Sequence, residues 1–162
     1  MTVRPATDAD AAAISAVYDH HVLHTLATFD LVPPTLEHRR AWLADHAGGR
    51  HRVLVAERAG AVVGFASSGR FRPRPAYDAT VETSVYLAPD AVGQGLGRAL
   101  YTALFEVLAG EDVHRAIAVI AQPNPASEAL HRAFGFRHVG TFGEVGHKFG
   151  RYVDVAWFQK DV

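Results

Sequence analysis

The spacing of apolar residues predicts a strand followed by a helix in the middle of the chain. Segment Val81–Leu87 reads VETSVYL and is rich in β-forming residues, and Pro89 should end the strand because proline cannot donate to a ladder. From Leu96 to Leu108 apolar residues recur every three or four positions, which is typical of one face of a helix. Gly110 is placed to end this helix as a glycine cap.

The rest of the chain continues the succession of strands and helices. Segment 116–121 is continuously apolar, as expected for a buried strand parallel to 81–87, and the helical connection between the two should be right-handed. No repeat, low-complexity tract or linker divides the chain, so we expect one α/β domain over residues 1–162, with a mixed central β-sheet flanked by helices. Before the central strand we predict a strand at 3–5, a helix opened by a Thr7–Asp10 capping box with Ala13, Ile14, Val17 and Tyr18 on one face, and a helix from Thr35 to about Ala47 that Gly48-Gly49 stops. A hairpin of strands 53–57 and 61–66 follows these helices. After segment 116–121 we predict a helix from Asn124 to about Phe134 and two late strands at 137–142 and 152–158, joined by a turn at 146–151.

Composition narrows the class of protein. Of the 162 residues 49% are hydrophobic and the formal net charge is −1, so nothing favours nucleic acid or an acidic membrane surface as a partner. The chain has no cysteine, which excludes a disulfide framework, a thiolate metal site and a cysteine nucleophile. The N-terminus lacks a signal-like pattern, and no apolar run approaches the roughly 18 residues of a membrane span. We therefore expect a cytoplasmic protein without membrane or nucleic-acid partners.

Three histidines near the end of the first predicted helix raise the question of a metal site. His20 and His24 fall on one helix face, with His21 beside them. Only Asp19 stands nearby as a further ligand, and no HExxH pattern is present. We predict no metal site and interpret the histidines as a solvated helix end.

A glycine loop connects the central strand to its helix. Segment Gly93–Arg98 reads GQGLGR, and a glycine loop that leads into a helix presents free N–H groups beside the positive end of the helix dipole, a typical phosphate site. A P-loop would need lysine and a hydroxyl residue after the last glycine, where Arg98 and Ala99 stand. The G-x-G-x-G spacing also differs from the G-x-G-x-x-G of dinucleotide-binding folds. A pyrophosphate held by main chain alone remains, and coenzyme A fits that description.

This segment and the strand before it resemble motif A of the GNAT acetyltransferase superfamily. Over nearly the whole chain, the sequence is similar to the phosphinothricin acetyltransferase branch, whose members acetylate amino acids and also take methionine sulfone and sulfoximine. The resemblance implies a GNAT-type acyl-CoA N-acyltransferase domain that uses acetyl-CoA as co-substrate and no metal. It is carried by residues 3–7, 27–29, 71–77, 80–86, 124–127, 130–131, 134–136 and 145–151.

One position departs from the superfamily motif. The motif opens with arginine or glutamine three residues before its second-last glycine, and this chain has Val92 there, with Gln94 nearby. Because main-chain N–H groups provide most of the hydrogen bonds to the phosphates, we expect the coenzyme to bind more weakly or in a slightly different path, but not to lose its binding.

The resemblance places the coenzyme along the edge of the central strand and over the glycine loop. Main-chain groups of residues 85–87 would pair with the pantetheine amides as a peptide adds to a sheet edge, and their N–H groups would meet the oxygen that becomes negative during transfer. Asn124 and Ser127 are expected coenzyme contacts, although each could instead only cap a helix. The predicted coenzyme-binding residues are Val85, Tyr86, Leu87, Gly93, Gln94, Gly95, Leu96, Gly97, Arg98, Asn124 and Ser127.

Glu82 and His131 are the predicted catalytic residues. Alternation places Glu82 on one strand face with Ser84 and Tyr86, and a carboxylate among β-formers should have a raised pKa, which suits a general base. The pattern alone leaves open an exposed edge or an ion pair with a loop arginine; the match to the family's acidic residue favours a base that acts directly or through water. His131 stands where most of the superfamily has a tyrosine, and it could protonate the leaving thiolate or only pack beside Phe134.

The predicted acceptor site combines three segments. Phe29, between the first two predicted helices, is either a wall of the acceptor pocket or a core plug. Segment 69–77, with three arginines and two prolines, is either a solvated connection or a stiff loop that presents arginine to an anionic substrate; the resemblance favours the latter. Lys148 and Arg151 could close the pocket or meet a second subunit. The predicted substrate-binding residues are Phe29, Arg74, Pro75, Ala76, Tyr77 and Lys148.

The resulting hypothesis is an acetyl-CoA-dependent N-acetyltransferase in which a small amine attacks directly, with Glu82 as general base. Acceptors would be phosphinothricin, methionine sulfone or sulfoximine, or a related L-amino acid. Two alternatives remain: the same fold acting on a protein N-terminus or a polyamine, and a non-catalytic acyl-CoA-binding sensor. The basic loop at 69–77 argues against a polyamine, which requires an acidic site. The resemblance also implies a homodimer.

Overall fold

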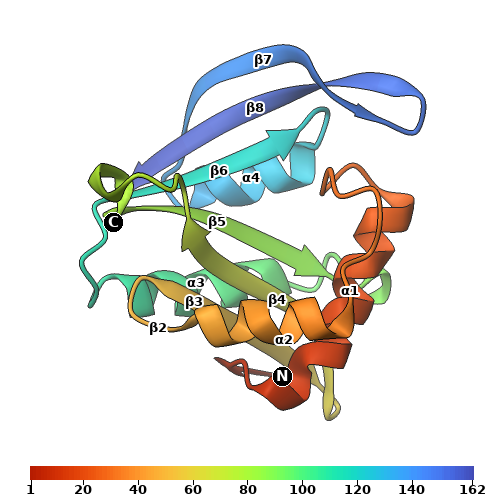
Figure 1. The fold of residues 1–162 in the computed structure, drawn as a ribbon, viewed down its shortest axis with the longest axis vertical. Coiled ribbons are helices and arrows are strands. Elements are labelled where there is room, and N and C mark those ends of the chain that lie inside the picture. The colour runs from red at the N-terminus through yellow and green to blue at the C-terminus, as the bar shows by residue number, and fades with distance from the viewer.

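The computed structural model describes residues 1–162 and shows a mixed eight-stranded β-sheet with four α-helices (Figure 1). The strands are β1 (Thr2–Pro5), β2 (Ala47–Gly48), β3 (His51–Arg58), β4 (Ala61–Arg70), β5 (Thr80–Leu87), β6 (Arg115–Ala121), β7 (Arg137–Lys148) and β8 (Arg151–Asp161). The helices are α1 (Ala11–His24), α2 (Leu36–Asp45), α3 (Leu96–Leu108) and α4 (Pro125–Ala133). The order across the sheet is β1-β3-β4-β5-β6-β8-β7, with β2 paired to β3. The predicted fold class is confirmed.

Most elements form where the residue pattern predicted them. The hairpin of β3 and β4 turns through Ala59 and Gly60, and β5 and β6 are parallel, as their apolar patterns indicated. The hydroxyl of Thr35 caps α2 by accepting a hydrogen bond from the His38 N–H (3.1 Å). The Thr7–Asp10 capping box is also present, but it opens a short 3-10 turn that leads into α1.

Three predicted boundaries are corrected. α2 ends at Asp45, because Ala47–Gly48 pairs with β3 as the short strand β2. The late strands extend to Lys148 and Arg151, so their turn contains only Phe149 and Gly150, both with positive φ. α3 ends at Leu108 without the predicted glycine cap: Gly110 is not left-handed, and its N–H donates to the Val107 carbonyl (3.2 Å). No helix is long and apolar enough to cross a membrane.

The helices cover both faces of the sheet. α1 and α2 lie on one face, and α3 and α4 lie on the other (Figure 1). Leu100 and Leu104 of α3 are fully buried in the larger core against β3 to β6. A smaller core joins Ile14 of α1 and Leu43 of α2 to Phe65 of β4. The chain thus has two apolar cores, and the sheet separates them.

The sheet opens between β5 and β6. β5 pairs with β4 from Val81 to Leu87, and β6 pairs with β8 along its whole length. The two parallel strands pair with each other only over Thr80–Glu82 and Arg115–Ile117, and beyond these residues they diverge (Figure 1). This opening connects the face covered by α1 and α2 with the face covered by α3 and α4. It positions the candidate site.

Candidate functional site

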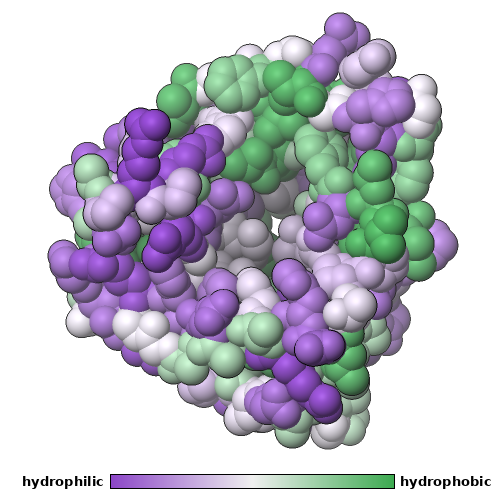
Figure 2. All heavy atoms as spheres, viewed as in Figure 1, coloured by the Kyte–Doolittle hydropathy of each residue, from purple (hydrophilic) through white to green (hydrophobic).

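A first cavity, cavity A, fills the opening between β5 and β6 on the face of α3 and α4. The walls of cavity A come from both parallel strands and from the helix that follows each of them. The lining residues are His21, Ala27, Thr83, Ser84, Val85, Tyr86, Leu87, Val92, Gly97, Val119, Ile120, Ala121, Asn124, Ala126, Ser127, Leu130 and His131. Figure 2 shows the other face of the molecule, on which α2 lies, and that face is hollowed near its centre.

Main-chain N–H groups of β5 point into cavity A. The Ala88 N–H donates to the Val63 carbonyl (2.8 Å), so the alternating antiparallel ladder turns the Tyr86 N–H toward β4. The same alternation turns the N–H groups of Val85 and Leu87 toward β6, which does not pair with β5 there. Of the three residues predicted to contact a ligand through this edge, only Val85 and Leu87 can do so with their N–H groups.

The glycine loop leads into α3 with a run of unpartnered N–H groups. Gly93 and Gly95 have φ values of 79° and 77°, a left-handed conformation that favours glycine. No hydrogen bond within the protein uses the main-chain N–H groups from Gly93 to Arg98. These groups surround the positive end of the α3 dipole. The loop can therefore hold a pyrophosphate without a metal ion or a lysine.

The side chain of Gln94 is held by the protein itself. Its amide nitrogen donates to the Asp90 carbonyl (2.8 Å), and its oxygen accepts from the Arg58 guanidinium (2.7 Å). Val92, at the position where the superfamily motif has arginine or glutamine, is 60% exposed at the mouth of cavity A. Gln94 therefore does not replace the missing polar side chain.

α4 begins at the rim of cavity A. The side-chain oxygen of Asn124 accepts a hydrogen bond from the Ser127 N–H (3.1 Å), so the capping role that the sequence left as an alternative is present. Both residues also line the cavity. The Asn124 side-chain NH₂ donates to no group of the protein, and it can contact a ligand while the oxygen caps the helix.

His131 is buried in a hydrogen-bonded pair with Tyr101. Its Nδ1–H donates to the Ser127 carbonyl (2.7 Å), which leaves Nε2 to accept from the Tyr101 hydroxyl (2.9 Å). Burial lowers the pKa of His131, so the ring is neutral near pH 7. Both nitrogens are engaged, and in this arrangement the ring has no proton free for a leaving group. The structure therefore places His131 as a packed residue in the wall of cavity A, and its acid role stays a prediction.

Glu82 lies on the other face of β5, in a second cavity, cavity B. This cavity is formed by β5, the end of β6, α1 and the segment after α1. Ser84 and Tyr86 line both cavity A and cavity B, so the opening between the strands joins the two. The lining residues of cavity B are Tyr18, Leu26, Ala27, Thr28, Phe29, Glu82, Ser84, Tyr86, Val119, Ala121 and Val155.

The carboxylate of Glu82 has no partner in the protein. It forms no hydrogen bond, and the ion pair with a loop arginine that the sequence left open is not formed. Burial raises the pKa of Glu82, and the charge of Arg72 opposes that rise. A half-buried, unpaired carboxylate that faces a cavity can accept a proton from a bound molecule.

The fold separates the predicted acceptor residues. Phe29 is 39% exposed and lines cavity B beside Gly146, so it is not a core plug. Arg74–Tyr77 is an exposed segment at the start of β5, and none of its residues lines cavity B. The Lys148 ammonium is buried and donates to the Thr28 carbonyl (2.7 Å), which fastens the β7–β8 hairpin to the segment after α1. Within this chain, therefore, only Phe29 of the predicted acceptor residues lines the cavity of Glu82.

Two residues close to these cavities were missed from the sequence. Tyr101 lies on the apolar stripe of α3 and holds the ring of His131. Arg39 of α2 is only 5% exposed and lines a third cavity. A signal existed for Arg39, because it precedes Trp42 and Leu43 by three and four positions and so falls on the apolar face of its helix.

The histidines of α1 do not assemble a metal site. No group of three or more metal-binding side chains is present in the structure. The rings of His20 and His24 lie 5.0 Å apart, on one helix face as their spacing indicated. His21 departs from the expected solvated helix end, because it is half-buried and its Nε2–H donates to the Leu87 carbonyl (2.8 Å). This bond ties α1 to the end of β5.

Comparison with known proteins agrees with this geometry. Residues 3–157 match the family described as acetyltransferase (GNAT) domain. The chain is 52% identical to a phosphinothricin N-acetyltransferase from Streptomyces coelicolor, over 99% of this chain and 95% of the relative. It is 40% identical to an L-methionine sulfoximine/L-methionine sulfone acetyltransferase from Pseudomonas aeruginosa, over 98% and 92% of the two chains. Its fold matches a GNAT superfamily phosphinothricin acetyltransferase from Sinorhizobium meliloti in complex with AcCoA, with a TM-score of 0.95, 37% identity, and coverage of 99% and 88%.

Proposed function

Since the chain belongs to the GNAT acetyltransferase family, we propose that it transfers the acetyl group of acetyl-CoA to the amine of a small amino-acid-like acceptor. The acceptors are phosphinothricin, methionine sulfone, methionine sulfoximine or a related L-amino acid, because the relatives at 52% and 40% identity are named for these compounds. One observation carries the proposal: β5 turns unpaired N–H groups into cavity A and Glu82 into cavity B, and the two cavities join beside it.

The groups around cavity A fit acetyl-CoA. The unpartnered N–H groups from Gly93 to Arg98 suit its pyrophosphate, and those of Val85 and Leu87 suit the amides of its pantetheine arm and the acetyl oxygen. Asn124 would add a contact at the rim. When bound, acetyl-CoA supplies the thioester carbonyl that the amine attacks. The related Sinorhizobium meliloti structure holds AcCoA, which supports this assignment.

Glu82 acts as the general base of the proposed reaction. An amino-acid amine is mainly protonated at neutral pH, so it must lose a proton before its nitrogen can attack. Glu82 accepts this proton directly or through a water molecule, and the N–H groups of Val85 and Leu87 stabilise charge on the acetyl oxygen. A C–N bond forms as the C–S bond breaks. The ammonium gives up two protons overall and the leaving thiolate takes up one, so the net reaction releases one proton to solvent.

His131 acts as a positioning residue in this scheme. Its hydrogen bond holds the Tyr101 hydroxyl beside Thr83, and the distance from that hydroxyl to the Thr83 Oγ1 is 3.5 Å. The pair therefore supports the middle of β5 from the face of cavity A. The proton that the leaving sulfur takes up comes from solvent that enters cavity A.

We also propose that the protein is a cytoplasmic homodimer. Support for the dimer is an exposed apolar surface on the β7–β8 hairpin, where Val139, Phe142, Val145 and Tyr152 are 55–67% exposed. Figure 2 shows hydrophobic residues gathered at the top of this face, where these strands lie. Exposed apolar surface of this kind marks an interaction site in many proteins. The cytoplasm is the compartment that supplies acetyl-CoA.

The proposed function is tested by the release of thiol from acetyl-CoA, measured with a chromogenic disulfide. The protein has no cysteine, so its own side chains do not react. We expect turnover with methionine sulfone or phosphinothricin. We expect Glu82→Gln to lower kcat by roughly 10²- to 10⁴-fold with unchanged acetyl-CoA affinity, because only proton removal is lost. Glu106→Gln, an exposed carboxylate on α3, is the matched control and should leave the rate unchanged.

Other acceptors in the same assay distinguish the alternatives. Release only with spermidine or with a peptide that has a free N-terminus would contradict the amino-acid acceptor while keeping the transferase. Tight coenzyme binding without turnover on any acceptor would favour the acyl-CoA sensor. Equal rates for Glu82→Gln and the unmodified protein would remove Glu82 from the reaction.

A further inference from the structure

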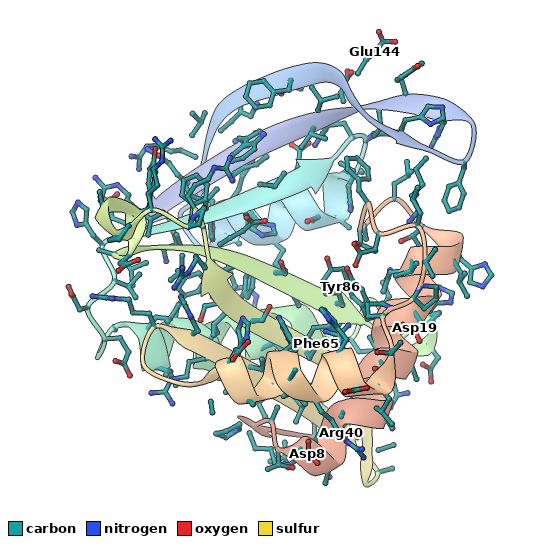
Figure 3. All side chains as sticks on the ribbon, in the orientation of Figure 1. Asp8, Asp19, Arg40, Phe65, Tyr86 and Glu144 are labelled. Carbon is teal, nitrogen blue, oxygen red and sulfur yellow. The ribbon has the colours of Figure 1, made fainter.

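A third cavity, cavity C, lies between α1, α2 and the strands β4 and β5. Its wall includes Arg39 from α2, Tyr18 from α1, and Ser84 and Tyr86 from β5. Figure 3 shows Phe65 and Tyr86 together at this place, on the side of the sheet that α2 covers. Arg40 and Asp8, by contrast, lie on the outer side of α2. Cavity C thus lies on the side of α2 that faces the sheet, and it shares residues of β5 with the candidate site.

The guanidinium of Arg39 is buried without a polar partner. The residue is 5% exposed, it donates no hydrogen bond, and it forms no ion pair; its Nε is fully buried and unsatisfied. The rings of Tyr18 and Trp42 hold it from two sides, with the guanidinium carbon 4.8 and 4.7 Å from their centroids. These cation–π contacts fix the plane of the guanidinium but satisfy none of its donors. The two terminal nitrogens of this cation remain unpaired and can donate to a ligand, whereas Nε is enclosed.

The nearby carboxylates form no ion pair with this cation. Asp19 and Asp30 influence the pKa of Arg39, yet neither forms an ion pair with it. Asp30 instead accepts a hydrogen bond from the Tyr18 hydroxyl (2.6 Å). A buried cation without hydrogen bonds is costly unless a partner pairs with it, and an anionic ligand in cavity C can be that partner. The planar guanidinium matches a carboxylate, which it can bind through two parallel hydrogen bonds.

The position of cavity C relative to β5 indicates which molecule would supply a carboxylate to Arg39. Ser84 and Tyr86 line cavities A, B and C alike, so the three compartments meet at these two side chains. An amine placed there lies beside Glu82 of cavity B and faces the edge of β5. In an α-amino acid the carboxylate is one carbon atom away from the amine. It can therefore enter cavity C while the amine stays at the junction.

We propose that Arg39 binds the α-carboxylate of the acceptor amino acid and thereby selects amino acids over other amines. This inference rests on the proposed function, since it names the group of the acceptor that the protein recognises. Sulfone, sulfoximine and phosphinate groups of the acceptor side chains then lie outside cavity C. Arg39 is a specificity-determining residue and takes no part in proton transfer.

The test compares methionine sulfone with its carboxamide, in which a neutral amide replaces the carboxylate. We expect the unmodified protein to prefer the acid in kcat/KM by on the order of 10- to 100-fold, the size of a charge-assisted hydrogen bond. In Arg39→Gln this preference should disappear, because activity falls with the acid and not with the amide. Arg39→Lys should restore part of it. Arg40→Gln, which changes an exposed neighbour, should keep the full preference.

A ratio of two substrates keeps the test independent of folding yield, since both are measured on the same preparation. An unchanged acid preference in Arg39→Gln would overturn the inference while the proposed function stands. Equal losses for phosphinothricin and its carboxamide in Arg39→Gln would also overturn it, because Arg39 would then bind the phosphinate. Absence of turnover with every amino acid in the unmodified protein would contradict the proposed function itself, and with it the premise of this inference.

Discussion

At the scale of single residues, the burial of Glu82 determines the pH range of the proposed reaction. A general base works only when it is deprotonated, so kcat/KM falls as the pH drops through its pKa. Burial raises the pKa of Glu82. The acid limb, the part of the pH profile in which kcat/KM falls toward low pH, should therefore lie above the pKa of about 4.3 expected for an exposed glutamate. The limb should be absent from the residual activity of Glu82→Gln. Initial rates at subsaturating acceptor across the pH range measure both curves.

A substitution of Arg72 tests this assignment, because the direction of its effect on the acid limb is fixed. The positive charge of Arg72 lowers the pKa of Glu82, so Arg72→Gln should move the acid limb to higher pH. No such effect is expected from Arg74→Gln, an exposed arginine two residues away. A limb that does not move in Arg72→Gln would belong to another group, such as the amine of the acceptor.

At the scale of elements, the start of α3 depends on the backbone of its glycine loop. Gly95 has a φ of 77° and no atom within 4 Å of an added Cβ, so any effect of a substitution comes from the backbone. Gly95→Ala should lower the free energy of unfolding by about 1–2 kcal/mol, the cost of a left-handed alanine. It should also weaken coenzyme A, because the N–H groups of the loop lose their arrangement. Chemical denaturation and calorimetric titration with coenzyme A give the two values.

Gly110, at the other end of α3, is the matched control. Its φ is not positive, and an added Cβ would make only an ordinary contact with the Val107 carbonyl at 3.6 Å. Gly110→Ala should therefore keep both the stability and the affinity for coenzyme A. Equal affinity in the Gly95→Ala and Gly110→Ala proteins would contradict the assignment of the glycine loop to the pyrophosphate.

At the scale of the whole molecule, the β7–β8 hairpin carries the surface proposed for dimerisation. Phe142 and Val145 are 55% and 60% exposed on this hairpin. A charge placed in an apolar interface is not compensated, so Phe142→Glu should convert the dimer to a monomer. Sedimentation equilibrium measures the mass. Val32→Glu, which adds the same charge at a residue that is 77% exposed and lies outside the hairpin, should stay dimeric. A monomeric unmodified protein at high concentration would contradict the proposed dimer.

Much of the fold and part of the candidate site could be predicted because they depend on neighbours in the chain. Alternation along Val81–Leu87 was sufficient to place Glu82 on the face that now lines cavity B. The glycines and the apolar stripe after Gly93 were sufficient to predict the free N–H groups of the glycine loop, because unpaired N–H groups at a helix start are a local property. The boundaries of α2 and of the late strands were less accurate, since pairing with another strand decided them.

Only the tertiary structure decided which predicted residues come together. The opening after Glu82 exists because β6 stays paired with β8 while β5 stays paired with β4, and no local pattern encodes that divergence. Arg39 became a buried, unpaired cation because α1 and α2 enclose it, whereas Arg74–Tyr77 lies exposed before the start of β5. The sequence by itself thus determined the elements and the chemistry of the glycine loop, since both arise from adjacent residues. The cavities required contacts between distant segments, and only the packed chain creates those.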